Sequence, residues 1–381
     1  MVPRLAPGRN PRYHPRVKAL PLVVRPGLRF TCHRCGVCCR TSTVGLDPGE
    51  RERIEGHDWT REGERFRAGF AVPGTDPWGR ARDDLRHGPD GACIFLDRDG
   101  LCLVEKRLGR EAKPRICRKF PFVFVAAPGG ERLAVSVECA SRWRSLRDGE
   151  PVGAQWGDVV FARERSEPHH VKWRVQAAPN GRLLAPEEYA ALERRLRADV
   201  EVERPILETI RALAAAPPAA FEAALERTLR ALVETAGRDT EEGEHLRAVA
   251  EEMLAAGPTA WVDVLAAADA ARDGAWFLRE MLASGLDEAL PGRDPTAADG
   301  VGHMIAGVVL AAALGRRYAR LGSGPGLPAA GPAAAAASAA LPPVGWLNLG
   351  ARTASMFLRG PGGKRLRERA GGLAALARAP T

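Results

Sequence analysis

Residues 32–39 read Cys-His-Arg-Cys-Gly-Val-Cys-Cys, so that four of the chain's eight cysteines fall within eight positions. The other four stand at positions 93, 102, 117 and 139, and no cysteine follows in the rest of the 381-residue chain. Thiols concentrated in this way in a reducing compartment are typically occupied by a metal ion. The clustering therefore predicts a metal site before any other function.

The first three cysteines of this stretch follow a Cys-x2-Cys-x2-Cys spacing. A two-residue spacer lets the backbone curl so that thiolates face one ion while N–H groups of the loop donate to sulfur. Gly36 suits a loop that must take an unusual backbone angle. Neighbouring side chains diverge, so Cys38 and Cys39 are expected either to serve two ions or to include one cysteine that does not ligate.

The later cysteines can join the cluster only if turns deliver them. Residues 93–96 and 101–103 flank Asp99-Gly100, a pair that favours a tight hairpin. A short helix should follow and end at Gly109. A second hairpin is expected from residues 120–127 and 133–137. Between the cluster and these hairpins, Asp47, with Pro and Glu behind it, predicts the start of a helix.

Two metal chemistries remain open on this spacing. Four thiolates around Zn²⁺ form a closed, redox-silent site that contributes folding energy. The same three-cysteine run also occurs in bacterial ferredoxins, where a remote cysteine completes an iron–sulfur cluster. Eight sulfurs suffice for two four-ligand sites of either kind, so we expect zinc or iron ions as cofactors, with an iron–sulfur cluster as the alternative.

The chain divides by composition into an α+β cysteine-rich domain with β-hairpins and an all-α domain. Amphipathic helical patterns, which mark the all-α part, recur over residues 186–201, 204–216, 218–236, 239–256, 260–287 and 300–321. The predicted divisions are a basic extended arm at 1–27, the metal-binding domain at 28–150, the helical domain at 180–322, a low-complexity linker at 323–343 and a basic tail at 344–381.

The net charge of +9 is placed unevenly. Residues 1–46 contain nine Lys or Arg and no acidic residue. We interpret this arm as an electrostatic offset for bound thiolates rather than a nucleic-acid site, because no aromatic or base-reading motif accompanies it. An acidic protein partner is the alternative interpretation. The arginine and alanine richness resembles bacterial coding bias.

No membrane segment is expected. The apolar run near the N-terminus is too short for a signal peptide, and the run from Val301 to Leu314 is too short to span a bilayer. We therefore expect a soluble, cytoplasmic protein whose cysteines do not form structural disulfides.

The cysteine pattern resembles the YkgJ-type cysteine-cluster family, whose domain is described as zinc- or iron-chelating. The resemblance rests on Phe30-x-Cys32-x2-Cys35-Gly36-x-Cys38-Cys39-Arg40, on Cys93-x-Phe95-Leu96 and Cys102, and on Pro114-Arg115-x-Cys117-Arg118-x-Phe120-Pro121. It covers about residues 30–140. It implies that the metal-binding set consists of Cys32, Cys35, Cys38, Cys39, Cys93, Cys102 and Cys117. We add Cys139 as an eighth member, because it follows the second predicted hairpin.

A more distant resemblance connects the chain to flagellin lysine N-methylases of the FliB type. Residues 139–142 stand where that family has an additional cysteine, and Trp276-Phe277-Leu278-Arg279 opens a similarly placed helical stretch. This resemblance implies an iron–sulfur-dependent protein methylase that uses S-adenosylmethionine. The first cluster departs from that family's spacing, and the chain lacks a Gly-rich strand-to-helix turn for the cofactor. The sequence leaves open whether the protein is an enzyme.

Histidines supply the remaining candidates. His33 lies inside the cluster and could replace a thiolate, although so many cysteines make this unnecessary. We expect His169 and His170 to be exposed and His303 to be a hydrogen-bonded core residue. The helical domain is the expected contact for a protein partner or substrate.

Overall fold

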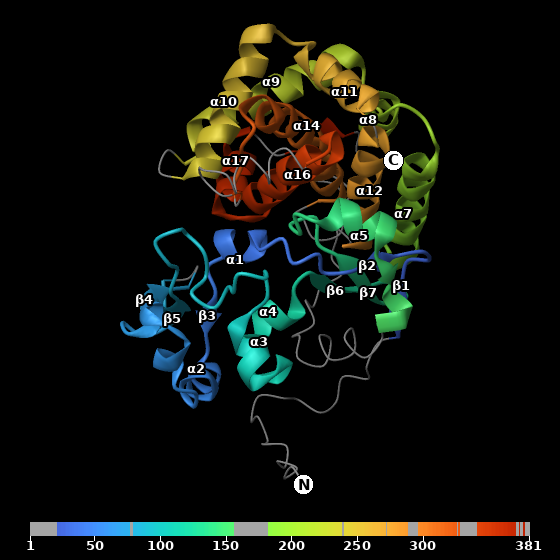
Figure 1. Ribbon diagram of the computed structural model, residues 1–381. Coiled ribbons are helices and arrows are strands. Elements are labelled where there is room, and N and C mark those ends of the chain that lie inside the picture. The colour runs from blue at the N-terminus through green and yellow to red at the C-terminus, as the bar shows by residue number, and fades with distance from the viewer. Residues whose placement is uncertain are drawn as a thin grey trace.

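The computed structural model describes residues 21–76, 79–155, 182–237, 240–271, 273–288, 296–325, 327, 341–370, 373 and 376–377. The N-terminal part contains short strands and short helices, and the part from residue 186 onward is helical. Figure 1 shows the N-terminal part below and the helical part above, with α1 (Val37–Thr41) between them. The predicted α+β class is confirmed.

A three-stranded sheet in the order β1-β7-β6 lies against the helical part. β6 (Phe122–Ala127) and β7 (Gly130–Val135) form the predicted second hairpin. β1 (Leu22–Val24) pairs in parallel with β7, because this run of apolar and β-branched residues favours a strand. The last residues of the predicted arm at 1–27 therefore belong to a sheet, while residues 1–20 lie outside the described residues.

A second three-stranded sheet lies on the far side of the N-terminal part. Its order is β3-β5-β4, with bounds Gly45–Leu46 for β3, Ala81–Leu85 for β5 and Ala71–Thr75 for β4. Helix α2 (Pro48–Glu55) begins as predicted, because the Asp47 carboxylate accepts the Glu50 N–H at 2.7 Å and the Glu50 carboxylate accepts the Asp47 N–H at 3.0 Å.

An aromatic core joins this sheet to the cysteine region. Phe95 is almost completely buried, and its ring centroid lies 4.7 Å from that of Trp59 and 5.4 Å from that of Phe66. Edge-to-face and tilted contacts of this kind add to the stabilisation from burial. The two 3-10 turns that carry the partner rings are η1 (Trp59–Glu62) and η2 (Glu64–Phe66).

The predicted first hairpin at residues 93–103 is only partly formed. Isolated bridges pair His87 with Cys93 and Leu96 with Cys102, and turns replace regular strands. The turn at Gly100 reverses the chain as expected, but each arm is too short for a ladder. The helix that follows, α3 (Leu103–Leu108), ends at Gly109 as predicted.

Short elements complete the N-terminal part. They are β2 (Arg29–Phe30), η3 (Arg110–Ala112), α4 (Arg115–Lys119), α5 (Arg142–Asp148), β8 (Glu150–Pro151) and η4 (Val152–Gln155). β2 and β8 pair antiparallel.

The helical part follows the predicted pattern closely. Its first helices are α7 (Pro186–Glu201), α8 (Ile206–Ala214), α9 (Pro218–Thr235) and α10 (Glu241–Ala256). The single helix expected at 260–287 is two helices, α11 (Ala260–Ala270) and α12 (Gly274–Asp287). The first helix is capped by Ala271, which is extended, and Asp273 takes a left-handed conformation as the N-cap of the second helix. Gly274 then approaches the Ala268 carbonyl too closely for a Cβ atom.

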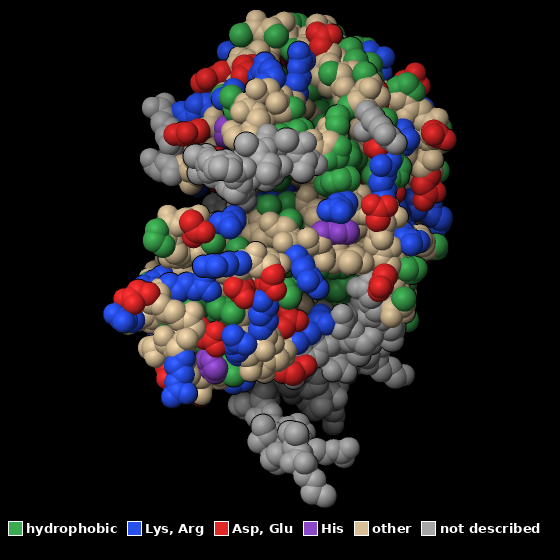
Figure 2. All heavy atoms as spheres, in the orientation of Figure 1, with side chains coloured by type: hydrophobic (Ala, Val, Ile, Leu, Met, Phe, Trp, Pro, Cys, Tyr) green, Lys and Arg blue, Asp and Glu red, His purple; other side chains and the backbone are tan. Residues whose placement is uncertain are grey.

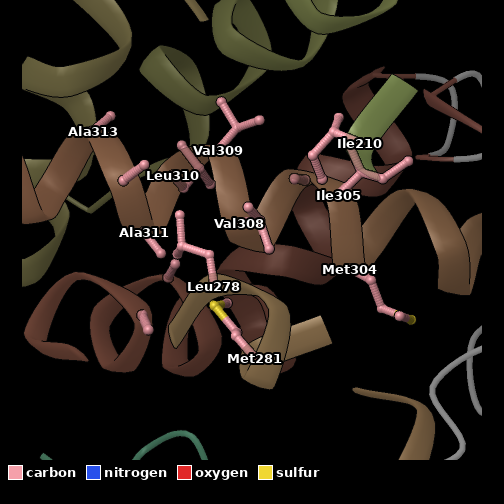
Figure 3. Packing of buried hydrophobic residues seen from close by; sticks show 14 of the residues in the cluster. Ile210, Leu278, Met281, Met304, Ile305, Val308, Val309, Leu310, Ala311 and Ala313 are labelled. Carbon is pink, nitrogen blue, oxygen red and sulfur yellow. The ribbon is translucent and has the colours of Figure 1, made fainter. Parts of the chain in front are cut away.

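Helix α14 (Ala297–Leu321) forms the centre of the largest core. Its central residues Val308, Val309 and Leu310 are buried among α8 and α12 residues such as Ile210 and Leu278 (Figure 3). By length and composition alone this helix could cross a membrane, but its apolar window is entirely buried inside the protein.

Helix α16 (Pro343–Arg359) corresponds to the first half of the predicted basic tail at 344–381, and it is not a tail. It packs along α14 and is buried over most of its length, because its apolar residues recur on several faces. Helix α17 (Pro361–Ala370) follows and packs on α9 and α16. Most of the predicted linker at 323–343 lies outside the described residues.

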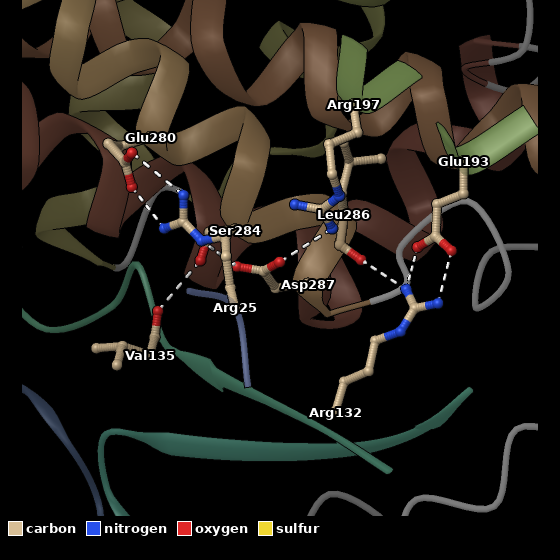
Figure 4. Close-up of polar contacts among 9 residues, drawn as sticks. All are labelled: Arg25, Arg132, Val135, Glu193, Arg197, Glu280, Ser284, Leu286 and Asp287. Atoms are coloured by element: carbon tan, nitrogen blue, oxygen red, sulfur yellow. Dashed lines mark hydrogen bonds and ion pairs between the residues drawn. The ribbon is translucent and has the colours of Figure 1, made fainter. Parts of the chain in front are cut away.

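Charged side chains join the sheet to the helical part (Figure 4). Arg25 contacts Glu280 at 2.6 Å and Asp287 at 3.0 Å, both on α12. Arg132 on β7 donates to Glu193 on α7 at 2.6 Å. The Ser284 hydroxyl donates to the Val135 carbonyl at 3.2 Å. The N-terminal part is thus bonded to the helices by several partly buried contacts.

Candidate metal centre

The eight predicted cysteines come from six places in the N-terminal part. Cys32 and Cys35 lie in the loop before α1, Cys38 and Cys39 lie in α1, and the other four come from later segments. Cys93 and Cys102 occupy the two isolated bridges, Cys117 lies in α4, and Cys139 lies in the turn between β7 and α5. All eight are thiols without a disulfide partner.

The loop that carries Cys32 and Cys35 has an irregular backbone. Arg34 and Gly36 both take positive φ angles, of 56° and 70°. A Cβ atom on Gly36 would also lie 3.3 Å from the Leu96 side chain, so glycine is needed for both its conformation and its close packing. The turn at Gly100 packs against the Arg34 carbonyl, and a Cβ atom there would overlap that oxygen. The turn of the first partial hairpin therefore packs directly against the cysteine loop.

The loop group consists of Cys32, Cys35 and Cys139. The pKa of Cys35 is raised by burial and by the nearby sulfurs of Cys38 and Cys32. Burial raises the pKa of Cys139 to about 12, with added repulsion from Cys35 and Cys38. The Cys139 sulfur also lies 3.6 Å from the Ser141 hydroxyl. These interactions place the turn after β7 beside the first cluster, although 100 residues separate them in sequence.

The turn group consists of Cys93, Cys102 and Cys117. Burial raises the pKa of Cys93 to about 11, with further repulsion from Cys102 and Cys38. The pKa of Cys117 is raised by burial and by the same neighbours, together with Cys93. Lys113 lies near Cys102 and Cys117 and lowers the pKa of each, against the effect of burial. The three thiols therefore interact electrostatically with one another, and Cys102 and Cys117 also interact with Lys113.

Cys38 and Cys39 stand between the two groups. Their sulfurs lie 3.9 Å apart, and this contact, followed by burial, raises the pKa of Cys38 well above its ordinary value. The Cys93 N–H donates to the Cys39 carbonyl at 2.7 Å, which ties α1 to the turn group. Cys38 interacts with members of both groups. The cysteine pair thus connects the loop group to the turn group.

The donor set fits zinc or iron by its chemistry. Thiolate is the preferred ligand of structural Zn²⁺ and of iron–sulfur centres, and clustered thiolates repel each other unless a cation lies among them. Within the described ranges, no three Cys, His, Asp or Glu side chains are arranged so that they could hold one metal ion together. Three of these sulfurs could therefore ligate one ion only if their side chains turned toward it.

Buried nitrogen atoms without hydrogen-bond partners also lie in this region. The Nε2 atom of His33 and the Nε and Nη1 atoms of Arg352 are buried and have no hydrogen-bond partner. His33 lies in the cysteine loop, and burial and Arg144 lower its pKa, which favours the neutral ring. Arg352 lies close enough to Cys38 and Cys139 to interact with their charges.

Helix α16 contributes residues that the sequence analysis did not single out. Asn348 is fully buried, and its Nδ2 donates to the Cys139 carbonyl at 3.0 Å while its Oδ1 accepts the Trp143 N–H at 2.9 Å. Arg352, one turn later, donates to the Thr41 hydroxyl at the end of α1. The sequence does carry a signal for these residues. Polar residues at 348, 352, 355 and 359 form a stripe with helical spacing in a largely apolar segment.

The other candidate histidines lie elsewhere. His303 is buried in α14, in agreement with the expected core position. His169 and His170 lie outside the described residues.

The surface of the N-terminal part mixes both signs of charge, as Figure 2 shows for one face. Arg107 contacts Glu62 at 2.6 Å, Arg51 contacts Asp83 at 2.7 Å, and Lys106 contacts Asp97 at 2.6 Å. Basic side chains of this surface are thus engaged with carboxylates. Such pairing leaves these side chains less available for phosphate groups.

Residues 31–140 match the domain family CxxCxxCC, described as "Putative zinc- or iron-chelating domain". The chain contains a CxxCxxCC domain. The matched span includes all eight cysteines and less than a third of the 381 residues. No curated protein and no solved structure matches the chain, and the resemblance to flagellin lysine N-methylases is not shown by these comparisons. The CxxCxxCC domain indicates zinc or iron chelation, in agreement with the donor chemistry above.

Proposed function

We propose that this protein binds zinc or iron through its clustered cysteines, in two sites that share the cysteine pair. One site uses the loop group, Cys32, Cys35 and Cys139, and the other uses the turn group, Cys93, Cys102 and Cys117. Cys38 and Cys39 supply the remaining ligand of each. The Cys38–Cys39 pair carries this proposal, because its sulfurs lie 3.9 Å apart, the Cys93 N–H donates to the Cys39 carbonyl, and Cys38 interacts with members of both groups.

A bound metal ion would stabilise the segments that carry the cysteines. All eight cysteines lie in loops, turns, isolated bridges or helices of five residues. Such short elements are weak without external support. A bound metal ion stabilises the folded state because it binds the folded chain and not the unfolded one. When bound, the metal would supply cross-links between segments that lie far apart in sequence.

The experiment is anaerobic purification followed by elemental analysis and a visible absorption spectrum. Colourless protein with bound zinc supports thiolate sites of a structural kind. Brown protein with iron and acid-labile sulfide supports the iron–sulfur form and makes redox or radical chemistry the next question. A control chain with all eight cysteines replaced by serine measures adventitious metal. Wild-type protein that holds no more zinc or iron than this control would refute the proposal.

A cytoplasmic location and a protein contact through the helical part belong to the same proposal. Reduced thiols persist in the cytosol, and a thiolate site would be lost to disulfide formation in an oxidising compartment. Fractionation and crosslinking in cells of the source organism test these two points.

A further inference from the structure

A buried arginine outside the CxxCxxCC domain reaches the cysteine centre. Arg352 on α16 is only 2% exposed, and its Nη2 atom donates to the Thr41 hydroxyl. That hydroxyl in turn donates to the Val37 carbonyl at 2.7 Å. Thr41 and Val37 are the last and first residues of α1, the helix that carries Cys38 and Cys39. The arginine is therefore fixed against the cysteine helix.

The guanidinium has few compensating groups. Its Nε and Nη1 atoms have no hydrogen-bond partner, and its Nη2 atom donates to a neutral hydroxyl, that of Thr41. The negative charges that interact with it come from Glu138, Glu242, Cys38 and Cys139. A buried cation without a partner costs several kcal/mol of stability in general, so an arginine is retained at such a place only if something compensates it.

Metal-bound thiolates would provide that compensation. Four thiolates around a divalent ion carry two net negative charges, whereas four thiols carry none. Arginine suits this role because it stays charged when buried and presents several donors in a rigid plane. Sulfur accepts hydrogen bonds from such donors, and outer contacts of this kind tune metal affinity.

We propose that Arg352 is a positioning residue of the metal centre, whose guanidinium balances the charge of metal-bound thiolates at Cys38 and Cys139. Helix α16 is thereby part of the site, although it lies more than 200 residues beyond the CxxCxxCC domain. This inference rests on the proposed function. It also explains why a charged residue stands in the middle of a buried helix.

Two substitutions in the full-length protein separate charge from hydrogen bonding. Arg352→Gln keeps a donor for Thr41 and removes the charge, while Arg352→Lys keeps the charge. Thr353→Val is the matched control, because Thr353 is equally buried on the same helix and contacts the Tyr318 hydroxyl at 3.1 Å, away from the cysteines. The probe is Zn²⁺ alone, with affinity measured by competition with a chromophoric chelator and the thermal midpoint measured with and without zinc.

Arg352→Gln is expected to weaken zinc binding at least tenfold, while Arg352→Lys stays within about threefold of wild type. The metal-free midpoint of Arg352→Gln should be equal to or above that of wild type, because an uncompensated charge has been removed. Addition of zinc should raise the thermal midpoint of Arg352→Gln by less than it raises that of wild type. Thr353→Val should lower both midpoints equally and leave zinc affinity unchanged.

Two results overturn the inference and leave the proposed function intact. One is wild-type zinc affinity in Arg352→Gln. The other is an equal fall of its midpoint with and without zinc, which would make Arg352 a structural residue only. If Arg352→Gln does not fold, a loss of affinity beyond tenfold in Arg352→Lys with wild-type metal-free midpoint also contradicts the charge argument. Wild-type protein that binds no zinc or iron would instead refute the proposed function itself.

Discussion

Asn348 holds the backbone of Cys139 through a hydrogen bond of 3.0 Å between its side-chain nitrogen and the cysteine carbonyl. The two residues are 209 positions apart, and Asn348 completes its bonding by accepting the Trp143 N–H. The turn that delivers the last cysteine is therefore positioned by the C-terminal helices. The candidate metal centre and the helical core are therefore not independent parts.

Replacing Asn348 by leucine should destabilise the protein by about 3 kcal/mol, because a buried carbonyl and a buried N–H each lose their partner. Urea unfolding of the metal-free protein measures this loss. Asn348→Asp keeps an acceptor for Trp143 and should fall between wild type and Asn348→Leu. A loss below about 0.5 kcal/mol in the leucine variant would show that the bond contributes little.

A Cβ atom at Gly100 should disturb the cysteine loop. Gly100→Ala places that atom against the Arg34 carbonyl oxygen, and the turn must move away. Gly91→Ala is the matched control, because Gly91 has a similar positive φ of 73° against 77° but no atom within 4 Å of the added Cβ. The control should cost about 1 kcal/mol from backbone strain alone. Gly100→Ala should cost more and reduce bound metal, as measured by urea unfolding and elemental analysis. Equal effects of the two substitutions would contradict the close contact.

Phe95 should be a principal support of the turn group. Its ring packs among Trp59, Phe66 and Phe70, and it lies two residues after Cys93. Phe95→Ala should lower the free energy of unfolding by about 4 kcal/mol and reduce metal retention, while Phe95→Leu should lose less than half of that. Urea unfolding measures the free energy of unfolding of both variants, and elemental analysis measures their bound metal. Full metal retention in a destabilised Phe95→Ala variant would show that this aromatic core does not support the turn group, which would contradict the prediction.

The contact between Arg25 and Glu280 should make stability depend on pH. Burial raises the pKa of Glu280, but the hydrogen bond and charge of Arg25 outweigh it, so that the pKa lies below its ordinary value. The carboxylate therefore stabilises the fold above its unfolded pKa, and this contribution is lost as the pH falls through the lowered folded pKa. Glu280→Gln should be less stable than wild type by about 2 kcal/mol at pH 7. The difference should shrink in acid when metal-free proteins are unfolded in urea, and a difference independent of pH would contradict the assignment.

The sequence was sufficient to locate local elements where short-range signals are strong. The capping residues around Asp47, the second hairpin and helices such as Pro186–Glu201 follow directly from residue patterns. The cysteine positions likewise marked the candidate centre, because no other residue type clusters in this way. The split of one predicted helix at Asp273 was missed, since a left-handed residue in a polar turn has only a weak signature.

Contacts between segments far apart in the sequence could not be predicted from residue spacing. Residues 344–381 look like a basic tail by charge, yet packing against α14 buries the helix at Pro343–Arg359, because long-range contacts override local composition. The positions of Asn348 and Arg352 beside the cysteines follow from that packing. The separation of the sulfurs into two groups also depends on turns and bridges whose geometry the spacing alone does not determine.

The most direct test is the number of zinc and iron atoms per chain in the wild type and in two single variants, Cys35→Ser and Cys117→Ser, all purified anaerobically. One variant removes a sulfur of the loop group and the other a sulfur of the turn group, at positions that the two groups do not share. The account predicts that each variant loses the metal of its own site and keeps the other's. Wild-type protein without bound zinc or iron, or variants that retain the full wild-type content, would contradict it.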